Sequence, residues 1–253
     1  MIGWLLIALL LLCLVVERLR APGRFRTADT LTNVWTFAGY LLISLVWGPV
    51  LFELYSLARD HAIFDFGPHW LDVGSGRFWL SWCALFLLDD FSFYWFHRAS
   101  HASPVLWAAH STHHASTQFN LSVGLRQSWT PFVALPFWIW LPLLGFDPLM
   151  VMSMQFFSLI YQSFTHTEGV PRLGMFEIVF NTPQHHSIHH GINDAYLNKN
   201  FGGALIVWDR ISRTWTGSSE PVRYDIGRSI DHPLAGLQGW FELFRKHPST
   251  GEQ

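Results

Sequence analysis

The sequence predicts an all-α fold, a polytopic membrane bundle of about four to five transmembrane helices with a histidine-rich cap on its cytoplasmic side. Three observations support this prediction. Half of the 253 residues are hydrophobic and only 13% are charged, a composition typical of membrane proteins. Several apolar runs approach the roughly 20 residues that a helix needs to cross a bilayer. Nine of the 14 histidines lie in groups at helical spacing or beside such runs.

The first apolar run covers residues 1–16 and ends at Glu17 and Arg18. It is somewhat short for a span unless the flanking residues contribute. A cleaved signal peptide is the alternative, but no basic residue precedes the run and no small-x-small cleavage site follows it. We therefore expect an uncleaved first helix.

Four further helices are expected along the chain. Residues 33–57 and 78–96 predict the second and third spans. Residues 129–146 and 149–164 predict the two arms of a helical hairpin, because the Gly-Phe-Asp-Pro sequence at 145–148 breaks the helical pattern between them.

The distribution of basic residues predicts the topology. With the amino terminus outside, 14 of the 16 lysines and arginines are cytoplasmic, including the four arginines between residues 18 and 26, and only Arg59 and Arg77 are outside. His97 and His166 then end their helices on the cytoplasmic side, where the other histidine groups also lie. We expect a multi-pass protein of the bacterial inner membrane with its active site on the cytoplasmic face. The opposite topology inverts this arrangement but keeps the histidines together.

From about residue 167 the composition becomes less apolar, which predicts a cap on the membrane helices. The cap supplies three of the grouped histidines, so we expect one unit over 1–253, with N-terminal membrane helices to residue 84, a histidine-containing core over 85–216 and an interfacial tail over 217–253. Residues 202–208 are either a buried strand or an interfacial segment. Four large apolar residues between 240 and 244 have helix-like spacing and predict a helix on the bilayer surface.

The grouped histidines predict a two-metal centre. Spacings of three and four residues bring side chains onto one helix face about one turn apart, where two imidazoles can hold one ion. A single pair is also compatible with hydrogen-bonded core histidines, but three such groups favour metal binding. Imidazole suits iron, zinc, copper and nickel, so the ligands alone leave the element open. The candidate ligands are His97, His101, His110, His113, His114, His166, His186, His189 and His190.

Two aspartates, Asp89 and Asp90, lie inside the third apolar run, where ionisable groups are costly and usually functional. Asp90 is seven residues before His97 and therefore on the same helix face. Ligating histidines often donate their second ring N–H to a carboxylate, so we expect Asp90 to orient His97. The alternative is a near-interface aspartate that pairs with an arginine or with water.

Several classes of site are excluded. Cys13 and Cys83 both lie in apolar runs, which leaves no disulfide framework and no cysteine-based zinc module. The net charge of −2 and the absence of a basic tract indicate no nucleic-acid partner. The Gly-Ser-Gly at 74–76 stands without the remainder of a dinucleotide fingerprint. Electrons for a redox reaction must therefore come from an external donor.

Eight of the nine candidate ligands lie in the stretches 90–101, 106–114 and 186–190, in sequence contexts that resemble the fatty acid hydroxylase and sterol desaturase superfamily of membrane di-iron enzymes. The resemblance covers residues 85–216. Within the superfamily, the stretches at 120–128 and 199–203 are most similar to the alkylglycerol monooxygenase group and its bacterial relatives.

The resemblance implies two ferrous ions held by the nine histidines, dioxygen as co-substrate and hydroxylation of a lipid C–H bond, with a fatty acyl, alkyl ether or sterol-like substrate. Desaturation by the same centre is the alternative. The implied electron donor is a ferredoxin or cytochrome with its reductase, or a tetrahydropterin. The implied partners are thus a membrane lipid and a redox partner or reductant, while the role of His185, the exact lipid and the oligomeric state stay open.

Two other functions use similar ligands. A di-zinc membrane hydrolase would also bind through imidazoles, but catalytic zinc usually has fewer protein ligands and keeps a position for water. A metal transporter or storage protein would need ligands along a membrane path, whereas these are expected at one face. Both alternatives are less favoured than the di-iron oxidase.

Overall fold

The computed structural model describes residues 2–66, 72–227 and 233–245. Within these ranges the fold is helical, and the one strand-like pairing is an isolated antiparallel bridge between Phe180 and Leu205. The predicted all-α class is therefore confirmed.

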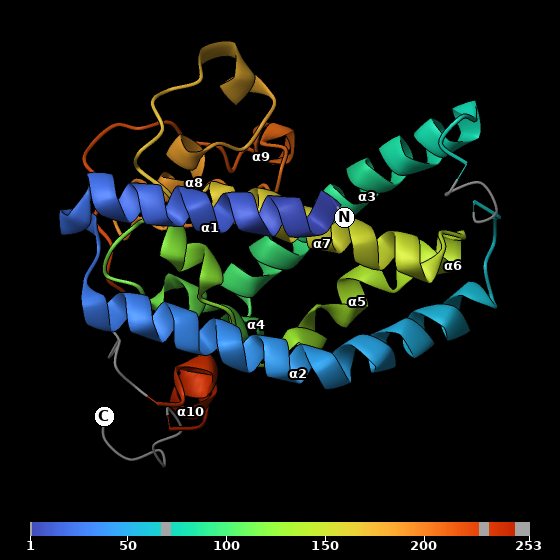
Figure 1. Ribbon diagram of the computed structural model, residues 1–253, viewed down its shortest axis with the longest axis horizontal. Coiled ribbons are helices and arrows are strands. Elements are labelled where there is room, and N and C mark those ends of the chain that lie inside the picture. Colours follow the sequence, from blue (N-terminus) through green and yellow to red (C-terminus); the bar gives the residue numbers. More distant parts are fainter. Residues whose placement is uncertain (1, 67–71, 228–232, 246–253) are drawn as a thin grey trace, which may run out of the picture.

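Four long helices form the frame: α1 (Ile2–Arg20), α2 (Thr27–Arg59), α3 (Gly76–Ala102) and α7 (Pro148–Phe164). In Figure 1, α1 and α2 run in opposite directions along the long axis, joined at one end by η1 (Pro22–Arg24). Helix α7 contacts α1, α2 and α3. These helices correspond to four of the predicted runs and extend several of them by a turn or more.

One helix among the described residues, α2, is long and apolar enough by itself to cross a membrane. The outer faces of the other long helices also expose large apolar side chains, including Trp4 and Leu5 on α1 and Trp79 and Leu80 on α3. Soluble monomers rarely expose apolar surface of this extent, so these faces need an apolar environment.

The predicted hairpin has the expected turn but a different first arm. Gly145 adopts φ +119°, and a Cβ there would lie 2.1 Å from the Phe64 carbonyl oxygen, so the turn requires glycine. Asp147 then caps α7 by accepting the Leu149 N–H at 2.9 Å. The expected first arm over 129–146 is helical but shorter, Pro131–Leu144, and is interrupted.

This arm consists of η4 (Pro131–Ala134), α5 (Leu135–Trp138) and α6 (Trp140–Leu144). Prolines at positions 131, 136 and 142 explain the interruption, because each removes a backbone donor and its ring clashes with the preceding turn.

The core lies where α2, α3, α6 and α7 meet. Its most buried members are Tyr55, Leu85, Leu141, Met150 and Val151. These residues set the spacing of the helices whose ends carry the candidate ligands.

The cap lies at the end of the bundle where η1 joins α1 to α2 (Figure 1). It contains η5 (Gly174–Ile178), α8 (Pro183–His189) and α9 (Val207–Ser212), and beside it lie α4 (Pro104–His110), η2 (His113–Ala115) and η3 (Leu121–Leu125). The segment 202–208, expected as a strand or an interfacial segment, is a buried loop that runs into α9.

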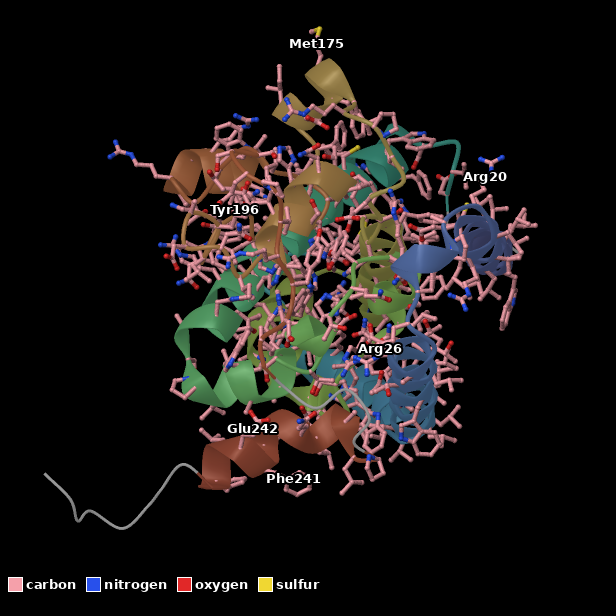
Figure 2. The ribbon with its side chains drawn as sticks, turned by 90° about the vertical axis from the view of Figure 1, so that its left-hand side faces the viewer. Arg20, Arg26, Met175, Tyr196, Phe241 and Glu242 are labelled. Atoms are coloured by element: carbon pink, nitrogen blue, oxygen red, sulfur yellow. The ribbon has the colours of Figure 1, made fainter. Side chains whose placement is uncertain are left out.

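The predicted carboxy-terminal helix is present as α10 (Gln238–Arg245), preceded by η6 (Ala235–Leu237). It contacts α4, and Trp240 Nε1 donates to Thr130 Oγ1 at 3.1 Å. Figure 2 shows that α10 lies across the bundle direction and that Phe241 points away from the protein. Its position on a bilayer surface stays a prediction, and residues 228–232 and 246–253 of the expected tail lie outside the described ranges.

Candidate metal centre

All nine candidate histidines converge at the cap end of the bundle, in two groups. Within each group, one possible ligand atom per residue lies within 4.8 Å of those of the other members. The first group, here called the five-histidine group, comprises His97, His101, His110, His114 and His189. The second, the four-histidine group, comprises His113, His166, His186 and His190.

The groups do not follow the sequence clusters. Pairs four residues apart do stay together, as the helical spacing predicts: His97 with His101, His110 with His114, and His186 with His190. The adjacent residues His113 and His114 belong to different groups, with ring planes at 89° to each other. Adjacent side chains on a helical segment point about 100° apart, so these two rings face different groups. The second and third sequence clusters are therefore each divided between the two groups, which they link along the chain.

The hydrogen-bond partners of the rings show which nitrogen faces the centre. His113 Nδ1 lies 3.1 Å from the Arg126 carbonyl oxygen, and His166 Nδ1 lies 2.8 Å from that of Gln162. A carbonyl can only accept, so each Nδ1 carries the proton and each Nε2 presents a lone pair. The two Nε2 atoms lie 3.0 Å apart. Two facing lone pairs at this distance repel each other, and a cation between them would remove that repulsion.

The five-histidine group shows the same feature. His97 and His189 donate from Nδ1 to the carbonyls of Phe201 and Lys199, both at 2.8 Å. The Nε2 atoms of His97 and His101 are buried and have no hydrogen-bond partner among the described residues. Buried polar atoms are normally satisfied, so these orphaned nitrogens fit a metal site.

Burial also keeps the imidazoles neutral. Loss of solvent around the ring lowers the pKa of His113 to about 4 and that of His189 to about 3. Neutral imidazole is the form that binds metal ions, so both groups can take up metal at pH 7 without first releasing protons.

His185 belongs to neither group. Its Nε2 accepts a hydrogen bond from Trp215 Nε1 at 3.3 Å, and its backbone carbonyl accepts one from Asn200 Nδ2 at 3.2 Å. The role that the sequence leaves open is thus a contact within the cap.

The prediction that Asp90 directly orients His97 is wrong. Asp90 accepts hydrogen bonds from the backbone N–H groups of Ala204 and Leu205, at 2.5 and 3.1 Å, and from Trp208 Nε1 at 2.8 Å. Seven residues along a helix correspond to about 10 Å, so a shared face does not bring the carboxylate to the ring. The loop that contains Phe201 supplies the acceptor for His97.

Arg126 is a site residue that the sequence analysis did not identify. Its side chain is 0% exposed, and its guanidinium donates to Asp29 Oδ1 at 3.0 Å, Asn33 Oδ1 at 2.9 Å and the Thr112 carbonyl at 2.8 Å. Its own carbonyl accepts from His113. Arginine is seldom fully buried without partners, and here Asp29 on α2 is the charged partner. Because the two residues are far apart in the sequence, only the fold shows that Asp29 holds Arg126 in place.

Two cavities reach the histidines from different sides. The first, of about 290 Å³, extends between α2, α3, α5 and α7 and reaches His97, His110, His113, His166 and His186. Its apolar lining includes Trp47, Leu51, Phe93, Phe96, Leu135 and Trp138. The second, of about 390 Å³, reaches His101, His114, His189 and His190 from beside Trp107 and Leu197. The two cavities share no histidine, so the centre has two separate approaches.

The family model for fatty acid hydroxylase matches residues 82–214, more than half of the chain and almost the whole histidine core. The chain belongs to the fatty acid hydroxylase family. This membership confirms the resemblance seen in the histidine motifs.

The chain is similar to an alkylglycerol monooxygenase of Danio rerio. The two are 35% identical over 244 residues, which cover 96% of this chain and 52% of that protein. An alkylglycerol monooxygenase of Homo sapiens is 42% identical over 156 residues, covering 61% and 34%. A Delta(7)-sterol 5(6)-desaturase of Schizosaccharomyces pombe is 26% identical over 201 residues, covering 76% and 60%. The chain thus spans about half, or less, of the length of these monooxygenases, and no solved structure matches it.

Proposed function

We propose that this protein is a membrane-bound di-iron oxidoreductase that uses dioxygen to hydroxylate a C–H bond of a lipid. The observation that carries the proposal is the pair of histidine groups, five of whose nine members line a largely apolar cavity. Family membership and the monooxygenase relatives support lipid oxidation as the reaction class.

The five- and four-histidine groups would each hold one iron. Iron bound there would supply dioxygen activation and hydrogen removal from an unactivated C–H bond, the step that protein side chains cannot perform. The number of imidazoles favours redox iron over catalytic zinc, which usually takes three protein ligands. The carbonyls that accept from Nδ1 of His97, His113, His166 and His189 would hold each ring in place.

The first cavity would hold the substrate. Its aromatic and aliphatic lining suits an acyl or alkyl chain, and a chain lying there would exclude water from five of the histidines. The similarity to the alkylglycerol monooxygenase of Danio rerio makes an alkylglycerol the first lipid to test. Hydroxylation of the carbon next to an ether oxygen gives a hemiacetal, which then separates into an aldehyde and glycerol.

An external donor would supply the electrons. The second cavity reaches four histidines without passing through the lipid route, which supports delivery from the cap side. The donor is a tetrahydropterin, or a ferredoxin or cytochrome with its reductase. Hydroxylation consumes two electrons, two protons and one dioxygen and releases one water.

We place the cap on the cytoplasmic face of a bacterial inner membrane, with α1, α2, α3 and the α5–α7 hairpin crossing the bilayer. Figure 2, which looks onto the cap end, shows Arg20 and Arg26 there, beside the η1 connection. Arg59 lies at the opposite end of α2, where it pairs with Asp65. Basic residues accumulate on the cytoplasmic side of membrane helices, which supports this orientation.

Desaturation is a second candidate, favoured by the sterol desaturase relative. The same centre would remove a second hydrogen in place of transferring the hydroxyl group. Product analysis by mass spectrometry separates the two outcomes, because only hydroxylation incorporates label from ¹⁸O₂.

The first test is the metal content of the detergent-purified protein, measured by mass spectrometry beside His113→Ala and His189→Ala. We expect two irons per chain in the parent and less in each variant. Incubation with an alkylglycerol, ¹⁸O₂ and each donor class then tests the reaction. Two tightly bound zincs from iron-replete cells, with no oxygen consumption with any donor, would contradict the proposal and point to a hydrolase.

A further inference from the structure

The loop of residues 199–205 orients two ligands of the five-histidine group. The Lys199 carbonyl accepts from His189 Nδ1 and the Phe201 carbonyl from His97 Nδ1, both at 2.8 Å. His97 lies on α3 and His189 on α8, so one short loop aligns a ligand from each half of the protein. Among the described residues, the rings of the four-histidine group make no hydrogen bond to this loop, and His113 and His166 donate to the carbonyls of Arg126 and Gln162.

A buried carboxylate on α9 holds this loop. Asp209 is 0% exposed, and its two oxygens accept the backbone N–H groups of Phe201 at 2.8 Å and Gly202 at 2.7 Å. Thr214 Oγ1 donates to Asp209 Oδ1 at 2.6 Å, and Thr214 is in turn 3.1 Å from the Tyr94 hydroxyl. Asp209 makes no salt bridge within the described residues, so these donors compensate its burial.

Asp90 holds the following part of the loop through the Ala204 and Leu205 N–H groups. The glycines between the two carboxylates allow this close approach. A Cβ at Gly202 would lie 3.1 Å from Asp209 Oδ2, and one at Gly203 would lie 2.7 Å from Asp90 Oδ1. The loop is therefore held on both sides of Gly202 and Gly203 by acidic side chains that do not touch the histidines.

We propose that Asp209 is a positioning residue that sets the metal affinity of the five-histidine group through the carbonyls of Phe201 and Lys199, with Asp90 holding the same loop. The inference rests on the proposed metal centre and adds that its two sites have separate supports. Loss of an outer partner of this kind typically lowers metal affinity 10- to 100-fold. The loss here falls on one metal site, and the four-histidine group keeps its affinity.

Asp209→Asn is the most direct variant. It preserves size but replaces one acceptor oxygen with an NH₂ group that faces a backbone donor, so one of the Phe201 and Gly202 contacts is lost. Thr214→Val is the milder variant, because it keeps both carboxylate oxygens and removes only the hydroxyl donor. Asp29→Asn is the matched control, since Asp29 supports Arg126 on the side of the four-histidine group.

The experiment titrates the metal-free full-length protein in detergent with Co²⁺ and records its ligand-field absorption and stoichiometry. His101→Ala and His166→Ala provide reference spectra, each with a ligand removed from one group. We expect two Co²⁺ equivalents in the parent protein. In Asp209→Asn, we expect one equivalent of unchanged affinity and one at least ten-fold weaker, with the half-loaded spectrum matching that of His101→Ala. In Asp29→Asn, we expect the four-histidine group to bind the weaker equivalent, with a half-loaded spectrum that matches that of His166→Ala.

Unchanged affinity for both equivalents in Asp209→Asn, equal loss at both sites, or a spectrum that matches His166→Ala would overturn the inference. If Asp209→Asn does not fold, Thr214→Val decides, because it should weaken the same single equivalent by a smaller factor; a parent-like titration contradicts the inference. A parent protein that binds no Co²⁺ and no iron would refute the metal centre itself, which distinguishes that failure from this one.

Discussion

The two histidine groups lie side by side but are held by different parts of the molecule. In the five-histidine group, His97 and His189 donate to the 199–205 loop of the cap. In the four-histidine group, His166 donates to the Gln162 carbonyl one turn earlier on α7, and His113 donates to the Arg126 carbonyl. In the five-histidine group the two acceptor carbonyls thus come from one loop of the cap, whereas in the four-histidine group they come from α7 and from the residue that follows η3.

The supports of the two groups use the same chemistry. Each contains a buried aspartate that does not reach the metal ligands, Asp209 on one side and Asp29 on the other. Asp209 binds backbone N–H groups directly, whereas Asp29 acts through the Arg126 guanidinium. The comparison indicates that the sites can be perturbed one at a time, even though His113 and His114 link them along the chain.

The largest expected effect is that of Asp29→Ala, which removes the carboxylate that lies 3.0 Å from the buried Arg126 guanidinium. Breaking a buried ion pair in this way costs about 3–5 kcal/mol. We expect this loss in the free energy of unfolding, measured by denaturant titration in mild detergent, and a preferential loss of metal from the four-histidine group. A loss of less than about 1 kcal/mol, the range of a surface pair, would show that Arg126 does not depend on Asp29.

Removal of the metal is expected to destabilise the protein by about 3–4 kcal/mol, the contribution of a ligand present at 100- to 1,000-fold its Kd. The physical reason is that the inward Nε2 lone pairs, such as those of His113 and His166 at 3.0 Å, then face each other without a cation. Thermal unfolding with and without a chelator measures this effect, and re-addition of Fe²⁺ should restore the original midpoint. An unchanged midpoint would contradict a structural contribution from the ions.

Filling the first cavity should separate substrate binding from metal binding. Ala134→Phe places a ring among the cavity-lining residues, and we expect the KM for the lipid to rise about ten-fold, equivalent to about 1.4 kcal/mol. The iron content should stay at the parent value, because Ala134 belongs to neither histidine group. Leu197→Phe in the second cavity is the matched control and should slow reduction by the donor while leaving the KM for the lipid unchanged.

The smallest effect is expected for His185→Ala, the neighbour of His186. It removes the hydrogen bond from Trp215 and should cost about 1 kcal/mol of stability while metal content stays at the parent value. His186→Ala, measured in parallel, should lose metal from the four-histidine group. Equal metal loss in both variants would assign His185 to the centre after all.

Apolar runs in the sequence predict the long helices, and helical spacing predicts eight of the nine residues of the two groups. The ninth, His166, stands alone beside the last apolar run. The sequence also predicts the turn at Gly145 and the helix around Trp240. It does not predict how prolines 131, 136 and 142 divide one hairpin arm into three consecutive helical pieces. A proline indicates that a helix is interrupted there, but not the direction in which the chain continues. The Asp90 assignment is wrong for a related reason: a shared helix face says nothing about a loop that comes between two side chains.

The spacing of residues along a helix is a local property that repeats within one or two helical turns, so it can be recognised in the sequence. The pairing of His97 with the Phe201 carbonyl joins positions 104 residues apart, and the support of Arg126 by Asp29 joins positions 97 apart. Such contacts depend on the paths of loops and on which buried groups find partners, and these are decided when the helices and the cap come together. The sequence alone thus identifies the candidate ligands, whereas their division into two groups and the acceptors that orient them come from the tertiary structure.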